Sequence, residues 1–297
     1  MKTHNFVPLL LKKMKMMKKG LILEGGAMRG LFTAGILDVM MKNGLRPDGI
    51  VGVSAGACFG CNFKSHQIGR AIRYNKRFAR DSRYCSLSSL LKSGDIFNAE
   101  FAYHIVPTLY DPFDSETFEA DPMEFHLVCT DVLTGKPVYK NCTKGGHYLF
   151  DWVRASASMP LVSNIVEIDG YKLLDGGMTD SIPLQYFENK GYNKNIVILT
   201  QPEGYVKKQS RAMPLISFAL RKYPAVVEAM RTRYIMYNEQ LKYVREAEKC
   251  GKILVIRPNK PIPIGHICHN PEQMQAAYDM GFEHGERHLE EMLKFWK

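Results

Sequence analysis

The chain has 297 residues, of which 45% are hydrophobic and 24% charged, and this length allows one large α/β domain or two smaller ones. No window contains the roughly 18–20 uncharged apolar residues that span a bilayer, so we expect a soluble or peripheral protein rather than a helical membrane protein. The net charge of +10 comes without an aromatic-interleaved basic motif or the spacing of a DNA-binding fold, so we expect no nucleic-acid partner.

Lysines are concentrated near the start of the chain, between Lys12 and Lys19. The short apolar run Val7–Leu11 precedes this charge, which is the reverse of the order in a secretory signal. We therefore expect residues 1–19 to form a basic, flexible leader. The alternative is that this leader anchors the protein to anionic lipid headgroups, with each lysine contributing on the order of 1 kcal/mol.

Seven cysteines are scattered without the spacing of a disulfide framework, which favours a reducing compartment. We expect a cytoplasmic protein, peripheral to the inner membrane face if the leader binds lipid. Cys58 and Cys61 have redox spacing but fall within a predicted helix, so we interpret them as small packing residues rather than as a thiol site.

The first predicted elements alternate between buried strands and helices. Residues 20–23 form an apolar run that predicts a strand, and a helical pattern runs from Leu31 to Asn43. A second apolar strand is predicted at 49–53, followed by a helix over 55–65. This succession is typical of a parallel α/β sheet.

Later segments predict further strands and a helical end. Residues 68–120, rich in Arg, Tyr, Phe and Ser, are expected to form helices and loops layered over the sheet. The clearest hairpin pairs residues 165–168 with 171–174 around an Asp-Gly turn. The remaining predicted elements are strands at 124–131, 137–140, 195–200 and 252–256, helices within 214–249, and a final helix from Pro271.

The segment Gly52-Val53-Ser54-Ala55-Gly56 has the form G-x-S-x-G and lies between a predicted strand and a predicted helix. A sharp strand-to-helix turn lifts the serine hydroxyl clear of the backbone, and the flanking glycines let neighbouring chains approach. The pentapeptide also arises by chance as a plain turn of small residues. Its position between the two elements favours Ser54 as a nucleophile.

A glycine-rich segment, Gly25-Gly26-Ala27-Met28-Arg29-Gly30, follows the first predicted strand. Unpaired N–H groups between a strand end and a helix start can hold a phosphate or the oxyanion of an acyl-transfer intermediate. A dinucleotide fingerprint needs glycine where Ala27 stands, and no Gly-Lys-Ser/Thr marks a P-loop. Since the carboxyl ends of parallel strands share one sheet edge, we expect this loop beside Ser54 and prefer the oxyanion interpretation.

Asp175-Gly176-Gly177 follows the second strand of the predicted hairpin and offers a carboxylate base for Ser54. A carboxylate in an apolar pocket gains basicity and can accept the serine proton directly. A bare turn is the structural alternative, and Asp131 and Asp180 are competing carboxylates. A Ser-Asp-His triad is disfavoured, because that fold places its serine after several strands and only one precedes this one. The late histidines lie in a Pro-rich loop and a charged helix: His266, His269, His284 and His288.

Taken together, the glycine loop, the Gly-x-Ser-x-Gly turn and the Asp-Gly-Gly sequence resemble the patatin-like phospholipase family, as it occurs in bacteria. The block Ala155–Pro160 is similar to the Ala/Ser-rich, Pro-ended block that this family carries before its aspartate. Order and spacing agree over about residues 20–190. One departure is Ala27, since the family's loop usually has glycine there.

The resemblance implies an α/β protein with a three-layer α/β/α fold and a mainly parallel central sheet. It implies a patatin-like catalytic core over residues 20–190 and a C-terminal α/β extension at 191–297 packed on that core. The implied activity is that of a serine lipid acyl hydrolase, a phospholipase or esterase working through an acyl-enzyme and without a cofactor. Ser54 would be the nucleophile, Asp175 the proton acceptor, and the amides of Gly25, Gly26 and Ala27 the oxyanion hole. The supporting motif residues are Arg29, Gly30, Gly52, Gly56, Gly176 and Gly177.

The expected partner is a phospholipid or another acyl-ester lipid, with contact to an anionic membrane surface as an open possibility. Two other functions remain open: a catalytically silent lipid-binding protein of the same fold, and a histidine-assisted esterase of another fold. We expect no metal. His266-Ile267-Cys268-His269 could hold zinc, but a Pro-rich loop is the preferred interpretation. In the segment 284–288, Glu stands two residues after the first histidine, whereas the zincin motif needs it one residue after.

Overall fold

The computed structural model describes residues 17–297, so most of the predicted leader lies outside the described residues. The first strand, β1 (Lys18–Leu23), begins earlier than the sequence predicts. Lys18 and Lys19 therefore belong to the sheet rather than to the leader, because their backbone pairs with the strand at 192–198. Among the helices of residues 17–297, none is long and apolar enough to cross a bilayer.

The described strands form one eight-stranded sheet in the order β5-β6-β3-β2-β1-β7-β8, with β4 also pairing with β3. Pairing is parallel from β3 through β2, β1 and β7 to β8, and antiparallel among β3, β4, β5 and β6. The predicted hairpin of residues 165–174 and the mainly parallel sheet are thus confirmed. The remaining strands are β2 (Gly49–Val53), β3 (Glu124–Asp131), β4 (Lys136–Asn141), β5 (Val166–Ile168), β6 (Tyr171–Asp175), β7 (Tyr192–Ile198) and β8 (Ile253–Ile256).

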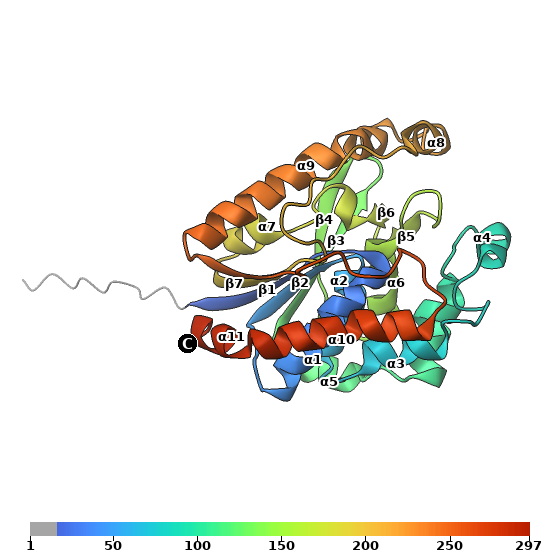
Figure 1. Ribbon diagram of the computed structural model, residues 1–297. Helices are drawn as coiled ribbons and strands as arrows, with labels where there is room; N and C mark the ends of the chain where they lie inside the picture. The colour runs from blue at the N-terminus through green and yellow to red at the C-terminus, as the bar shows by residue number, and fades with distance from the viewer. Residues whose placement is uncertain (1–16) are drawn as a thin grey trace, which may run out of the picture.

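Helices cover both faces of the sheet, which confirms the predicted three-layer α/β/α arrangement (Figure 1). Alternation along β1 explains the layering: Leu21 and Leu23 pack into one core, and Ile22 packs into the other. The first core holds α1 (Gly30–Lys42), α2 (Ala55–Lys64), α6 (Gly146–Ala157) and α10 (Pro271–Arg287). The second holds α7 (Leu184–Asn189) and α9 (Pro224–Lys249).

The C-terminal third of the chain completes the same sheet. β7 pairs with β1 and β8 pairs with β7, both in parallel. In the first core, α10 packs closely against α1. A Cβ added at Gly35 would lie 2.3 Å from the Tyr278 carbonyl oxygen, and a Cβ added at Gly281 would lie 1.9 Å from the Phe32 carbonyl oxygen. The end of the chain, beyond α11 (Leu289–Phe295), is fixed by Trp296, whose indole N–H donates to the Lys194 carbonyl.

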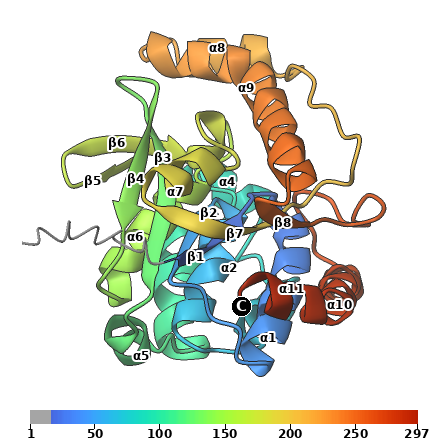
Figure 2. The same ribbon diagram turned by 90° about the vertical axis from the view of Figure 1, so that its left-hand side faces the viewer.

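Residues 68–120 form the predicted helical layer at the right of Figure 1. Its elements are α3 (Arg70–Arg77), α4 (Leu87–Ser93), the π-helix η2 (Phe101–Tyr110) and α5 (Ser115–Ala120). Phe78, Tyr84, Phe101 and Val106 make a separate small core within this layer. Opposite, α8 (Met213–Ala219) lies at the outer edge of the molecule near the start of α9 (Figure 2).

Candidate active site

Ser54 occupies the turn between β2 and α2, as the sequence predicts. Its backbone angles, φ 54° and ψ −119°, are strained for a residue with a side chain, as expected of a nucleophile turn. The turn is so tight that a Cβ at Gly52 would lie 2.5 Å from the backbone of Gly56, and one at Gly56 would lie 2.4 Å from the Leu23 carbonyl oxygen. The two flanking glycines are therefore required sterically.

Asp175 is the last residue of β6, and its side chain is buried. The Ser54 side chain is a neighbour of its carboxylate and favours the ionised form, and the carboxylate accepts the Gly177 N–H at 2.7 Å. The neighbouring Gly176 packs on β3, where a Cβ would lie 2.1 Å from the Val128 carbonyl oxygen. The fold thus brings positions 54 and 175 together from strands that are separated in the sheet by β3.

The block 155–160 holds both residues in place. The Ser156 hydroxyl accepts the Ser54 N–H at 3.0 Å and donates to the Val128 carbonyl at 2.6 Å. Two residues later, the carbonyl of Ser158 accepts the Asp175 N–H at 2.7 Å. One short segment at the end of α6 therefore fixes the backbone of Ser54 and that of Asp175 relative to each other.

The glycine loop passes directly over the serine turn. A Cβ at Gly25 would lie 2.9 Å from the Cβ of Ser54, and one at Gly30 would lie 2.7 Å from that of Ala55. Within the described part of the chain, the N–H groups of Gly25, Gly26 and Ala27 donate to no acceptor. Ala27 has φ 51°, a left-handed angle that glycine would adopt more easily. The loop therefore presents free donors beside Ser54, at the cost of strain at Ala27.

Ser54, Asp175 and the glycine loop all line one cavity of about 640 Å³. This volume falls within the usual range for small-molecule sites. One wall of the cavity is apolar and mostly aromatic, and it is formed by the helical layer 68–120 and α6. Its members include Tyr74, Tyr84, Phe97, Tyr103, Val106 and Phe150.

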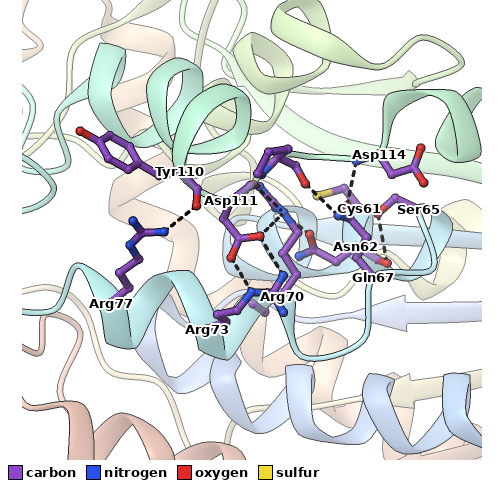
Figure 3. Close-up of polar contacts among 12 residues, drawn as sticks. Cys61, Asn62, Ser65, Gln67, Arg70, Arg73, Arg77, Tyr110, Asp111 and Asp114 are labelled. Carbon is purple, nitrogen blue, oxygen red and sulfur yellow. Dashed lines mark hydrogen bonds and ion pairs between the residues drawn. The ribbon is translucent and has the colours of Figure 1, made fainter.

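A polar cluster around Asp111 supports that wall (Figure 3). Arg73 donates two hydrogen bonds to the Asp111 carboxylate, at 2.7 and 2.8 Å. The buried Arg70 donates to the Asp111 carbonyl at 2.7 Å and to the Asn62 side chain at 2.9 Å. Arg77 donates to the Tyr110 carbonyl at 2.6 Å. These contacts join the end of the π-helix to α2 and α3. The wall is therefore attached to α2, the helix that directly follows Ser54.

Burial raises the pKa of Asp175 above the ordinary aspartate value. The nearby Arg233 guanidinium, the Ser54 side chain and the Gly177 N–H each act in the opposite direction. The carboxylate is therefore more basic than a free aspartate while its ionised form keeps specific stabilising contacts. A second buried carboxylate, Glu24, also has a raised pKa because of burial.

The competing carboxylates have other contacts. Asp131 caps the β3–β4 turn, accepting the Thr134 hydroxyl at 2.8 Å. Asp180 accepts the Tyr139 hydroxyl at 2.7 Å and the Gln240 amide at 2.6 Å. Neither residue lines the cavity.

The late histidines are dispersed. His266 lines the cavity and lies 3.0 Å from Arg29 Nη1. His269 contacts the Ala79 carbonyl, and His284 packs edge-on against Phe32 within the α1–α10 interface. Cys268 donates to the Asn270 carbonyl rather than turning toward the neighbouring histidines. Within residues 17–297, no three His, Cys, Asp or Glu side chains converge as metal ligands would.

The two cysteines with redox spacing lie inside α2, as the sequence indicates. Cys61 is fully buried, and its thiol donates to the Cys58 carbonyl at 3.2 Å. Burial raises the pKa of Cys61 to about 12 and that of Cys58 further, so both thiols stay protonated at neutral pH. Cys58 also forms part of the cavity lining.

Three cavity residues escaped the sequence analysis: Lys207, Arg233 and Tyr237. Arg233 donates from Nε to the Gly177 carbonyl at 2.6 Å, and Tyr237 donates to Glu24. Lys207 belongs to the segment before α8, whereas the other two lie one turn apart on α9. Only the helical spacing of Arg233 and Tyr237 could have suggested that they share a face.

Two protein-family sequence models match parts of the chain. A sequence model described as "Patatin-like phospholipase" matches residues 21–188, more than half of the chain. A second, described as "Domain of unknown function (DUF6363)", matches residues 223–297.

The chain is similar to several curated and solved proteins. It is 26% identical over 211 residues to "Uncharacterized protein YjjU" of Escherichia coli, which covers 67% of this chain and 56% of that protein. It is 24% identical over 297 residues to "Lysophospholipase nte1" of Aspergillus terreus, covering 92% of this chain and 18% of that protein. The solved structure of VipD from Legionella pneumophila has a TM-score of 0.46 and 12% identity, covering 93% of this chain and 67% of that one. The chain thus spans about half the length of the first relative and less than a fifth of the second.

Proposed function

The chain belongs to the patatin-like phospholipase family, and we propose that it hydrolyses acyl esters of lipids with Ser54 as nucleophile and Asp175 as base. The observation that supports this proposal is the shared cavity, which Ser54, Asp175 and the glycine loop with its unpaired amides all line. The similarity to a protein named lysophospholipase supports a lipid ester as the substrate.

In the first half-reaction, the Ser54 oxygen attacks the ester carbonyl carbon while its proton passes to the Asp175 carboxylate. The carbonyl oxygen becomes an oxyanion, which the N–H groups of Gly25, Gly26 and Ala27 stabilise. Collapse of this intermediate breaks the ester C–O bond, and the proton on Asp175 goes to the leaving alcohol. The product that remains is an acyl-enzyme on Ser54.

The second half-reaction repeats these roles with water. Asp175 accepts a proton from the water that attacks the acyl-enzyme, and the same amides hold the new oxyanion. The proton then returns to the Ser54 oxygen as the fatty acid leaves. The raised pKa of Asp175 supports this role, because a more basic carboxylate is a better proton acceptor.

The aromatic wall suits the acyl chain. Tyr103, Val106 and Phe150 present apolar surface on the same cavity as Ser54. Moving a hydrocarbon chain from water onto such a surface is favourable by about 0.8 kcal/mol for each buried methylene. We place the acyl chain against this wall and the alcohol portion toward the polar side.

The alternative of a silent lipid-binding protein shares the cavity but gives no reason for the strained serine turn. The discriminating experiment measures fatty-acid release from a mixed phospholipid extract by mass spectrometry, for wild type and for Ser54→Ala. We expect release by the wild type and a loss of about 10³-fold or more in the variant. Lipid binding without release by a folded wild-type protein would favour the silent alternative.

Peripheral contact with an anionic membrane is the second part of the proposal, and α8 is its support. Leu215 and Phe218 on this helix are 58% and 67% exposed, while Ile216 on its inner side lines the cavity. The exposed apolar pair is flanked by the exposed basic residues Arg211, Arg221 and Lys222. An apolar edge with flanking cations fits a surface of anionic lipid headgroups over an apolar interior. Docking there would bring the cavity close to its substrate.

A further inference from the structure

The cavity lining includes five cationic residues: Arg29, Arg70, Lys207, Lys208 and Arg233. Arg70 is paired with Asp111 and Lys208 is exposed, which leaves three half-buried cations: Arg29 from the glycine loop, Lys207 from the segment before α8, and Arg233 from α9. Within residues 17–297, none of the three forms an ion pair with a carboxylate. The cavity therefore collects positive charge that the protein leaves unpaired.

Lys207 is held in place by its surroundings. Its backbone N–H donates to the Asn238 side chain at 2.8 Å, and the Asn238 amide donates back to the Lys207 carbonyl at 3.0 Å. Its ammonium lies 4.4 Å from the centre of the Tyr237 ring. Burial, together with the nearby Arg233, lowers the pKa of Lys207 to about 8. An ammonium kept in such a place without an anion destabilises the protein, and a bound anion would offset that cost.

The two arginines have nitrogens left to donate. Arg233 uses Nε on the Gly177 carbonyl, at 2.6 Å, which fixes the guanidinium beside the end of β6. Arg29 contacts His266 through Nη1 at 3.0 Å, while its Nε is buried and has no hydrogen-bond partner among the described residues. A buried donor without an acceptor is costly, so this nitrogen also favours an incoming acceptor.

Both carboxylates near the cations are already engaged. Glu24 accepts the Tyr237 hydroxyl and also the N–H and hydroxyl of Thr200, at 2.6 and 3.1 Å. Asp175 accepts the Gly177 N–H and faces Ser54. Three cations against two carboxylates leave the cluster with a net charge of +1 when all five groups are ionised.

We propose that Arg29, Lys207 and Arg233 form a subsite for the phosphate of a glycerophospholipid, next to the ester that Ser54 cleaves. This inference rests on the proposed function and adds the substrate class, because a phosphate subsite selects phosphorylated lipids over neutral glycerides. Arginine and lysine nitrogens are the usual phosphate donors. Lys207 and Arg233 lie beyond the residues matched by the patatin-like phospholipase model, so the subsite is built largely by the C-terminal third of the chain.

The test compares two substrates that share one acyl chain: a 1-acylglycerol and the corresponding 1-acylglycerol 3-phosphate. The variants are Lys207→Met and the double variant Lys207→Met/Arg233→Gln, in which glutamine can still donate to the Gly177 carbonyl. For the phosphorylated substrate we expect KM to rise about tenfold in the single variant and more in the double, since each lost contact is charge-assisted. For the neutral substrate we expect smaller losses than for the phosphorylated one, so that the ratio of the two kcat/KM values falls about tenfold or more in both variants.

Arg231→Gln is the matched control, because Arg231 lies on the same helix but is exposed and paired with Glu228 at 2.7 Å. Equal losses on both substrates would overturn the subsite and indicate that the cations act only through Asp175. A wild type without preference for the phosphorylated substrate would also overturn it.

Binding provides a readout that is independent of turnover. Calorimetry measures binding of 1-acylglycerol 3-phosphate to Ser54→Ala and to Ser54→Ala/Lys207→Met. We expect binding to be about tenfold weaker when Lys207 is replaced. Unchanged binding would contradict the subsite even if hydrolysis occurs. Intact binding without any wild-type hydrolysis would instead contradict the proposed function and leave the subsite standing.

Discussion

The hydroxyl of Ser156 accepts a hydrogen bond from the backbone N–H of Ser54 at 3.0 Å and donates one to the Val128 carbonyl at 2.6 Å. These two hydrogen bonds connect the end of α6 to the nucleophile turn and to β3. The Ser54 backbone is strained, so its conformation depends on contacts of this kind. Ser156 is thus a positioning residue, which acts on the nucleophile through the backbone.

Replacing Ser156 with alanine should lower kcat by about tenfold or more, with a smaller change in KM. The substitution leaves the Ser54 N–H and the Val128 carbonyl unpaired, a loss of about 1–3 kcal/mol for each buried group. The measurement is steady-state hydrolysis of a p-nitrophenyl ester, accompanied by a thermal melt. Ser158→Ala is the control, because the Ser158 hydroxyl donates only to Arg154 and its contact to Asp175 is made by the backbone. Equal losses in the two variants would remove the special role of Ser156.

The pH profile should show an acid limb set by Asp175. A base must be ionised, so kcat/KM falls as pH decreases through its pKa, and burial places that pKa above the ordinary aspartate value. Arg233 opposes this rise, so Arg233→Gln should move the limb to higher pH. The profile is measured with a neutral ester, and Arg231→Gln should leave the limb where it is. A limb that moves to lower pH would contradict the assignment of Asp175.

Two small substitutions in the glycine loop should affect activity differently. Gly25→Ala introduces a Cβ only 2.9 Å from the Cβ of Ser54, so activity should fall by at least about tenfold through displaced amides. Ala27→Gly relieves the left-handed angle at that position and should keep activity, with a stability change within about 1 kcal/mol. Ester hydrolysis and thermal melts of both variants provide the comparison. Full activity in Gly25→Ala would separate the loop from catalysis.

Membrane contact should depend on α8. Leu215→Ser/Phe218→Ser removes the exposed apolar pair and should reduce sedimentation with phosphatidylglycerol vesicles by several-fold, while hydrolysis of a soluble ester persists. Leu87→Ser/Leu91→Ser changes an even more exposed apolar pair on α4; it is the control and should bind vesicles as the wild type does. Binding of the α8 variant at the wild-type level would place the membrane contact elsewhere.

Local sequence patterns predicted much of the sheet and the turn at Ser54. Ser54 could be placed because a strand, a turn of small residues and a helix follow one another without interruption, and the Asp-Gly turn fixed the hairpin that ends at Asp175. The start of β1 was wrong by two residues, since Lys18 and Lys19 join the strand only through pairing with β7. Long-range pairing of charged residues leaves no periodic signal in the sequence.

The polar side of the cavity could not be predicted. Lys207 and Arg233 reach the end of β6 from the segment around α8 and α9, and only the tertiary arrangement brings them beside Gly177 and Asp175. Basic residues in this region are also abundant on the exposed surface, so charge alone does not distinguish a lining residue from a solvated one. Likewise, the block with Ser156 was noted for its resemblance, but its hydrogen bond to Ser54 requires the coordinates.

Active-site labelling with a fluorophosphonate, followed by intact-mass and peptide mass spectrometry, tests the Ser54–Asp175 pair most directly. We expect one adduct per chain, located on Ser54, with no labelling of Ser54→Ala and labelling slowed by at least about 100-fold in Asp175→Asn. An adduct on another residue, or labelling of Asp175→Asn at the wild-type rate, would contradict this expectation.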